Sequence, residues 1–143
     1  MAYYPAFNAP SANEAYEHAP DLATEAAMAD EFAEFHETQM DDQDRAEIEQ
    51  DQDVRDMYRE CLLRIAAVAD RRWWQSRSEA DLTAAARAAG ALQNFDQAHP
   101  EQSAGPFGPD SVEWDATGGG RAYVRQEYLA WLIPQITERN SAD

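Results

Sequence analysis

Apolar residues recur at three- and four-residue steps in four stretches of the chain, which is the spacing of a helix that buries one face. The first stretch begins after Asp21, a residue that suits the N-cap and the positive end of a helix. The second begins at Val54 and ends near residues 74–77, and its apolar stripe is the clearest of the four. Its arginines occupy the other positions and are expected to face solvent: Arg55, Arg59, Arg64, Arg71 and Arg72.

Two further helices are predicted in the C-terminal half. Ser78 and Asp81 have the spacing of a capping box, and they open a helix whose inner stripe is mostly alanine. The last helix starts at Arg121, and Pro134 is expected to break or kink it unless a second short helix begins there. The pattern therefore predicts an all-α protein, a small bundle of about four helices.

Three segments lack a clear helical pattern. Residues 1–20 contain three prolines, which disfavour a helix, so they are predicted to form an extended arm. Its aromatic residues are expected to lie against the core or against a partner. Residues 41–53 are very polar and are expected to be a loop or the solvated first turns of the next helix. Prolines and glycines in residues 99–120 predict a long loop before the last helix, either functional or partly disordered. The predicted organisation is thus an arm followed by a single acidic helical domain, 21–143.

The negative charge of the chain is concentrated in one segment. The 143 residues carry a net charge of −17, and the segment from Glu14 to Asp53 holds fifteen carboxylates and one cation, Arg45. Such a surface repels phosphate backbones, which are bound by lysine and arginine. We therefore expect no direct binding of nucleic acid and look for a basic protein partner.

The carboxylates do not have the spacing of a metal site. In an EF-hand register that starts at Glu49, the sixth residue must be glycine for the sharp turn, and it is Val54. A carboxylate-bridged metal bundle needs glutamate three residues before histidine, and Ala33 holds that position before His36. No metal and no cofactor are predicted.

Motifs of catalysis are missing as well. Cys61 lies on the apolar stripe of its helix, where a thiol behaves as a small core residue. The three glycines at 118–120 precede a helix, whose N-terminus can bind anions, but without a preceding strand they are better interpreted as a flexible lead-in. The chain is predicted not to be an enzyme.

The sequence also suggests where the protein works. A single cysteine cannot form an internal disulfide, which is typical of a reducing compartment. There is neither a run of 18 apolar residues nor an N-terminal pattern of a signal peptide, so no contact with a membrane is expected. We expect the cytoplasm of a bacterium or of a phage-infected host; the oligomeric state is left open.

The acidic run predicts a surface that binds a partner. As one helix it would be about 60 Å long with about one carboxylate per 4 Å, close to the phosphate spacing of about 3.4 Å along a DNA strand. The first hypothesis is therefore nucleic-acid mimicry: the protein would occupy and block the cationic groove of a DNA- or RNA-binding protein. Small acidic proteins of phages and mobile elements that inhibit restriction or CRISPR machinery work by this mechanism as a class, and the protein could be such an inhibitor. The carboxylates expected to meet the partner are Glu31, Glu34, Glu37, Asp41, Asp42, Asp44, Glu47, Glu49, Asp51 and Asp53.

A second hypothesis needs no mimicry. The chain could be a helical protein-interaction module, such as an immunity protein, a secretion chaperone or a small subunit of a complex, whose acidic face meets one basic partner. A solvated structural or assembly protein is a third option. Mimicry predicts that DNA competes for the partner, whereas the module predicts that apolar contacts matter more than charge.

Overall fold

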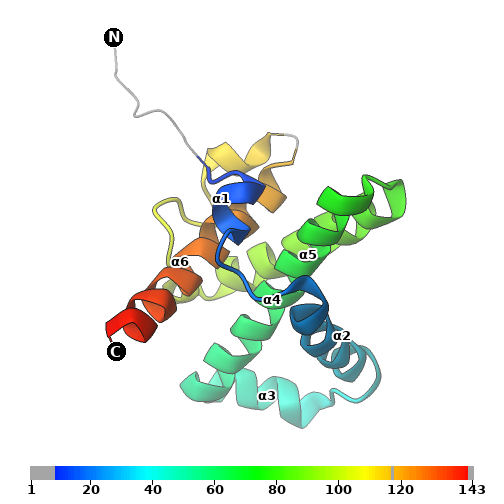
Figure 1. The fold of residues 1–143 in the computed structure, drawn as a ribbon. Coiled ribbons are helices and arrows are strands. Elements are labelled where there is room, and N and C mark those ends of the chain that lie inside the picture. Colours follow the sequence, from blue (N-terminus) through cyan, green and yellow to red (C-terminus); the bar gives the residue numbers. More distant parts are fainter. Residues whose placement is uncertain (1–8, 117, 142–143) are drawn as a thin grey trace.

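The computed structural model describes residues 9–116 and 118–141. Within them the fold is all-α and contains no strand, as the sequence predicts (Figure 1). There are six α-helices in this part of the chain, where about four were predicted, because residues 12–16 and 42–50 form two short helices that were not predicted as separate elements. The helices are α1 (Ala12–Tyr16), α2 (Leu22–Thr38), α3 (Asp42–Gln50), α4 (Gln52–Ser76), α5 (Glu79–Ala98) and α6 (Gly119–Ser141).

Helix α4 is the centre of the fold. Asp51 caps its N-terminus by accepting hydrogen bonds from the backbone N–H groups of Asp53 and Val54, and the helix ends at Arg77 in the left-handed conformation. It contacts α2, α3, α5 and α6, so most of its faces are covered by neighbouring helices (Figure 1). Burial on more than one face explains why polar residues of α4 enter the interior.

The main core lies where α4, α5 and α6 meet. Leu63, Leu92, Tyr123 and Tyr128 are fully buried there. The alanines of α5 allow a close approach, since a Cβ added at Gly120 of α6 would lie 3.3 Å from the Cβ of Ala89. A second, smaller core joins α2 to α4, with members Ala26, Ala29 and Val68.

Helix α1 corrects the prediction of a wholly extended arm. Ser11 and Glu14 form a reciprocal capping box, with distances of 3.2 and 3.3 Å from backbone nitrogen to side-chain oxygen. Ala12 and Ala15 are buried, and Tyr16 packs against the main core, so this part of the arm lies against the protein's own interior. The arm's remaining aromatics, Tyr3, Tyr4 and Phe7, lie outside the described residues.

Helix α3 settles the two alternatives left for residues 41–53, because it is separate from α4. Asp41 and Asp44 form its own capping box, and Asp51 is at once its C-cap and the N-cap of α4. The backbone of Asp51 is extended, with φ −116° and ψ 117°, which turns the chain between the two helices. Fifteen carboxylates therefore do not follow one straight helix.

The proline- and glycine-rich loop holds two 3₁₀ helices, Pro100–Gln102 and Val112–Asp115. Trp114 is buried and donates a hydrogen bond from Nε1 to the carbonyl of Gly108 at 2.8 Å. A Cβ added at Gly119 would lie 2.1 Å from the carbonyl oxygen of Trp114, so this position requires glycine. The final helix α6 then continues through Pro134, which does not break it.

Candidate functional site

The predicted partner-binding carboxylates lie on three successive elements. Three are on α2, five on or capping α3, and two at the start of α4. All ten are exposed except Asp44, which is partly covered. The structure thus places them on α2, α3 and the first turn of α4, and we call this surface the acidic face. Its members are Glu31, Glu34, Glu37, Asp41, Asp42, Asp44, Glu47, Glu49, Asp51 and Asp53.

Little cationic charge neutralises the acidic face. Asp42 lies 3.4 Å from Nη1 of Arg45, and Glu49 lies 3.4 Å from Nε2 of His99, a contact that is ionic only when the histidine is protonated. Among the described residues, no other cationic side chain comes within 4 Å of these ten carboxylates. The acidic face therefore presents mostly uncompensated negative charge.

Some acidic-face carboxylates also organise the backbone. Asp41 accepts a hydrogen bond from the backbone N–H of Asp44 at 2.8 Å, and this bond lowers the pKa of Asp41 below its usual value. Asp51 caps α4. Both residues lie at helix N-termini, where negative charge is favourable, so they hold the shape of the face as well as contributing charge.

An apolar groove lies between α2, α3 and α4, the three helices that carry the acidic face. Its volume is about 290 Å³. Two of its apolar side chains are notably exposed, Met57 at 61% and Phe35 at 37%, whereas Ile48 at its base is buried. Two carboxylates of α3, Asp44 and Glu47, also line it. The remaining lining residues are Phe32, Met40, Val54, Tyr58 and Cys61.

Sequence reasoning missed this groove because its apolar residues come from three elements whose mutual packing is not encoded locally. A signal existed in the spacing of Phe32 and Phe35. These residues share one side of α2 with Met28, itself 52% exposed, and two of the three are too exposed to belong to a core.

One carboxylate of the acidic run belongs to the interior. Glu25 is 1% exposed and accepts hydrogen bonds from the hydroxyl of Tyr128 at 3.0 and 3.1 Å. Arg71 lies 3.4 Å away and Arg64 3.7 Å away, so the buried charge is compensated. The signal in the sequence was that Glu25 stands one turn before Ala29, on the buried side of α2.

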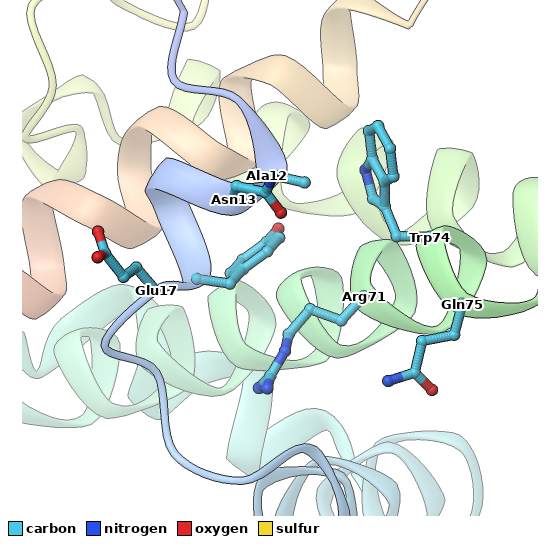
Figure 2. A pocket seen from close by; sticks show the side chains of 7 residues that line it. Ala12, Asn13, Glu17, Arg71, Trp74 and Gln75 are labelled. Carbon is cyan, nitrogen blue, oxygen red and sulfur yellow. The ribbon is translucent and has the colours of Figure 1, made fainter.

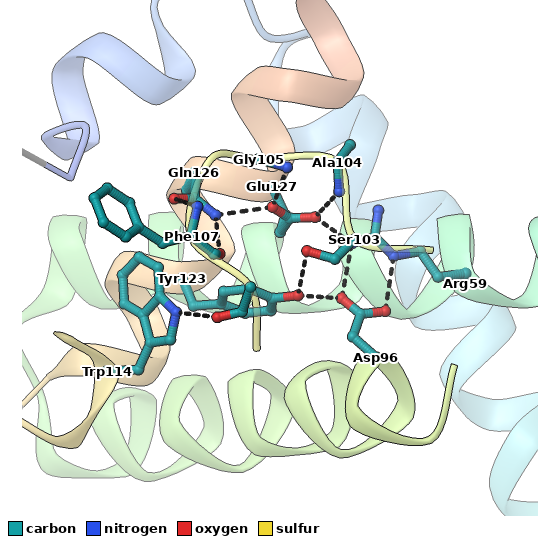
Figure 3. A network of polar contacts seen from close by, with 11 residues as sticks. Arg59, Asp96, Ser103, Ala104, Gly105, Phe107, Trp114, Tyr123, Gln126 and Glu127 are labelled. Atoms are coloured by element: carbon teal, nitrogen blue, oxygen red, sulfur yellow. Dashed lines mark hydrogen bonds and ion pairs between the residues drawn. The ribbon is translucent and has the colours of Figure 1, made fainter. Parts of the chain in front are cut away.

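A larger buried network joins α4, α5, α6 and the loop (Figure 3). Arg59, predicted to face solvent, is 6% exposed and pairs with Asp96 and with Glu127 at 2.8 and 2.7 Å. The oxygens of Glu127 also accept the backbone N–H groups of Ala104 and Gly105, each at 2.7 Å. The network fastens the loop to α6.

The same network holds a buried tyrosine in its neutral form. The hydroxyl of Tyr123 donates to Asp96, and burial together with this carboxylate raises the pKa of Tyr123 far above its usual value. Each carboxylate oxygen of Asp96 and Glu127 already has at least one donor. The cluster is fully paired, so it is a structural clamp and offers no group for acid–base chemistry.

A fourth buried carboxylate, after Glu25, Asp96 and Glu127, ties α1 to the core. Asp70 receives two hydrogen bonds from Arg125, at 2.8 and 3.0 Å, and one from the hydroxyl of Tyr16 at 2.7 Å. Burial and the nearby Asp70 raise the pKa of Tyr16 well above its usual value. This contact explains why α1 docks on the bundle.

A second cavity, of about 320 Å³, opens between α1 and the end of α4 (Figure 2). Its polar groups are largely engaged elsewhere: Tyr16 donates to Asp70, and Arg71 contacts Glu25 while lying over the ring of Tyr16. Trp74 and small or polar side chains complete its walls. This cavity brings together no catalytic constellation.

The described part of the chain contains no cluster of three or more histidine, cysteine, aspartate or glutamate side chains that could hold a metal ion. Cys61 is partly buried, and burial raises the pKa of its thiol, which makes it a poor nucleophile. None of the described helices combines the length and the apolar composition that crossing a membrane requires.

Comparison of the chain with protein-family models, with curated proteins and with solved structures finds no match.

Proposed function

We propose that this protein binds a basic surface on a partner protein and covers it. The observation that carries the proposal is the acidic face, on which eight of ten carboxylates have no cationic side chain of the described chain within 4 Å. Uncompensated surface charge raises the rate of association with an oppositely charged partner and selects against like-charged ones. The proposed activity is non-catalytic and occurs in a bacterial or phage-infected cytoplasm.

Of the two hypotheses for this activity, the protein-interaction module fits the geometry better. The acidic run is divided among α1, α2, α3 and α4, so its carboxylates do not repeat at a constant step along one axis. Two of them, Asp44 and Glu47, line an apolar groove instead, and an apolar centre bordered by charged residues is typical of protein–protein interfaces.

Nucleic-acid mimicry remains the second candidate, and α2 favours it. Glu31, Glu34 and Glu37 are exposed and spaced by three residues along one helix, at steps of about 4.5 Å. This spacing is near that of successive phosphates. In this form the partner is a DNA- or RNA-binding protein, such as a component of a restriction or CRISPR system, and binding inhibits it.

The proposal is tested by neutralising the α3 part of the acidic face. Asp41, Asp42 and Asp44 are changed to Asn and Glu47 and Glu49 to Gln, because asparagine preserves the cap of α3. A matched control neutralises five carboxylates elsewhere, Glu79, Glu101, Asp110, Asp115 and Glu138, all of them exposed.

Partners are captured from a lysate of the source cell on the immobilised protein, purified and measured individually by titration calorimetry at several salt concentrations. We expect the α3 variant to weaken binding by at least about tenfold, a loss of about 1.4 kcal/mol, and to flatten its salt dependence. The control variant should bind nearly as the parent does. Equal losses in both variants would show that only net charge matters and would refute a specific face.

Double-stranded DNA then separates the two candidates. If the partner binds DNA and DNA displaces it from the acidic face, the result supports mimicry. If the partner has no affinity for DNA, the interaction module is the correct form.

A further inference from the structure

All methionines of the chain except Met1 gather at the apolar groove. Met40 and Met57 line it directly, and Met28 lines a shallow extension of it beside Phe32 and Phe35. Methionine is flexible and polarisable, and proteins use it where one surface must adapt to different apolar side chains. Exposed fractions of 52% for Met28 and 61% for Met57 mean that neither side chain is needed to fill the core.

The groove is an opening on the surface with an apolar base. Ile48 of α3, 7% exposed, closes it below, and Phe35 of α2 and Met57 of α4 stand at its edges. Its volume of about 290 Å³ is near the lower end for ligand pockets, which hold a drug-sized molecule from about 300 Å³ upward. The groove is therefore better suited to one or two bulky side chains from a partner than to a cofactor.

The charged groups at this groove are acidic. Asp44 and Glu47 line it from α3, and Glu31 stands beside Phe35 in the extension along α2. On α4, Asp53 and Glu60 lie four residues before and three residues after Met57, on the same side of the helix. None of the residues lining the groove itself is cationic. A segment seated in the groove thus meets carboxylates and no cation of the lining, and two arginines, Arg45 and Arg64, lie in adjoining hollows.

We propose that the groove binds an amphipathic basic helix of the partner protein, with large apolar residues inserted between α2, α3 and α4 and arginine or lysine residues facing the carboxylates. A helix presents apolar anchors at steps of three and four residues and can carry cations on either side of that stripe. The inference rests on the proposed function, since it names the element of the basic partner that the acidic face meets.

The probe is a synthetic peptide of about 18 residues, long enough to form a helix, with leucine and tryptophan on one face and arginine on the rest. A second peptide has the same composition in an order that destroys the apolar face. A third replaces arginine by glutamate. Binding is measured by fluorescence anisotropy with the whole chain at several salt concentrations.

We expect the amphipathic basic peptide to bind at least about tenfold more tightly than the scrambled one, because only the former can bury its apolar residues together. The glutamate peptide should not bind. In nuclear magnetic resonance spectra of the whole chain, the methyl signals of Met28, Met40 and Met57 should shift on titration with the amphipathic peptide.

Two pairs of substitutions locate the binding. Phe35→Ser with Met57→Ser removes the exposed apolar edges of the groove. We expect this pair to lower the affinity for the amphipathic peptide about tenfold or more and to leave the salt dependence of binding unchanged. The control pair, Val112→Ser with Ile133→Ser, removes exposed apolar residues elsewhere, 75% and 50% exposed, and should change affinity less than about twofold. Met57→Gln alone serves as the milder variant if the serine pair lowers helicity.

Failure of this inference differs from failure of the proposed function. If the scrambled peptide binds as well as the amphipathic one, and the serine pair has no effect while the α3 charge variant does, the groove is not the anchor but the acidic face still binds basic partners. If the α3 charge variant binds every peptide as the parent does, the proposed function itself is wrong. Sedimentation showing a dimer that the serine pair dissociates would make a second copy the occupant and overturn the inference.

Discussion

Arg59 of α4 holds Asp96 of α5 through two hydrogen bonds, from Nε to Oδ1 at 3.2 Å and from Nη2 to Oδ2 at 2.8 Å. Both side chains are buried, and the same guanidinium reaches Glu127 of α6 at 2.7 Å. One cation therefore compensates two buried carboxylates on two helices, and the three-helix core depends on it.

Replacing Arg59 by methionine leaves both carboxylates buried without their cation. We expect a loss of about 3–5 kcal/mol in the free energy of unfolding, measured by urea denaturation followed by circular dichroism. The control is Arg72→Met, which removes an exposed pair with Asp30 and should cost less than about 1 kcal/mol. Similar losses in the two variants would mean that the buried pairing does not support the fold.

The buried tyrosines predict a loss of stability in alkali. The pKa values of Tyr16, Tyr123 and Tyr128 are raised above the ordinary value of 10.0 by burial and by neighbouring carboxylates. Their contribution to stability is complete below about pH 10 and is lost as the pH rises toward the folded-state values, because the unfolded chain ionises first.

Urea denaturation between about pH 8 and pH 11 measures this effect. Each buried tyrosine should add up to about 1.4 kcal/mol of destabilisation per pH unit above about pH 10. In Tyr128→Phe the free energy of unfolding should fall less steeply with pH, by the contribution of one tyrosine. An unchanged slope would show that this hydroxyl ionises equally easily in the folded and unfolded chain.

Glycine is needed at position 119 and not at position 90. Gly119→Ala places a Cβ against the carbonyl oxygen of Trp114, at 2.1 Å before relaxation, and should cost several kcal/mol by moving the loop off α6. Gly90 lies within α5 with no atom within 4 Å of an added Cβ, so Gly90→Ala should stabilise by up to about 1 kcal/mol. Thermal denaturation of the two variants gives opposite shifts if this is correct, and two losses would contradict it.

The side chain of Asp51 is expected to stabilise the first turn of α4. Asp51→Ala removes the side-chain oxygen that caps α4 and should cost about 1 kcal/mol, whereas Asp51→Asn keeps the cap and should cost little. Amide hydrogen exchange would show whether the first turn of α4 opens more often in the alanine variant. Equal exchange rates in the two variants would show that packing, and not the side-chain cap, stabilises the first turn of α4.

Local pattern was sufficient to predict the helical class and the limits of the longest helices. Ser78 accepts a hydrogen bond from the backbone N–H of Asp81 at 3.1 Å, and α4 ends at Ser76, within the predicted range of residues 74–77. The short helix α1 was not predicted, because Pro10 and Pro20 on either side of it favour an extended chain, although Ser11 and Glu14 have the spacing of a capping box.

Tertiary partners account for what the pattern could not predict. Arg59 and Glu25 are charged residues that side-chain type places at the surface, yet each is buried beside an opposite charge from a distant segment, Arg59 beside Asp96 and Glu25 beside Arg71. The ten carboxylates of the acidic face were identified as exposed candidates, but the groove between them depends on how α2 and α3 pack on α4. No spacing within one helix encodes that arrangement.

Helix α3 is joined to the rest of the protein mainly through Ile48, its one buried residue, and through the guanidinium of Arg55, which donates to the carbonyls of Ile48 and Glu49. Its outward positions are therefore free to change without disturbing the interior. Of the nine residues of α3 only Ile48 is buried, so substitutions at the other eight change the charge of the acidic face without changing the buried core. The surface proposed to bind a partner and the core that keeps the protein folded are therefore open to selection separately.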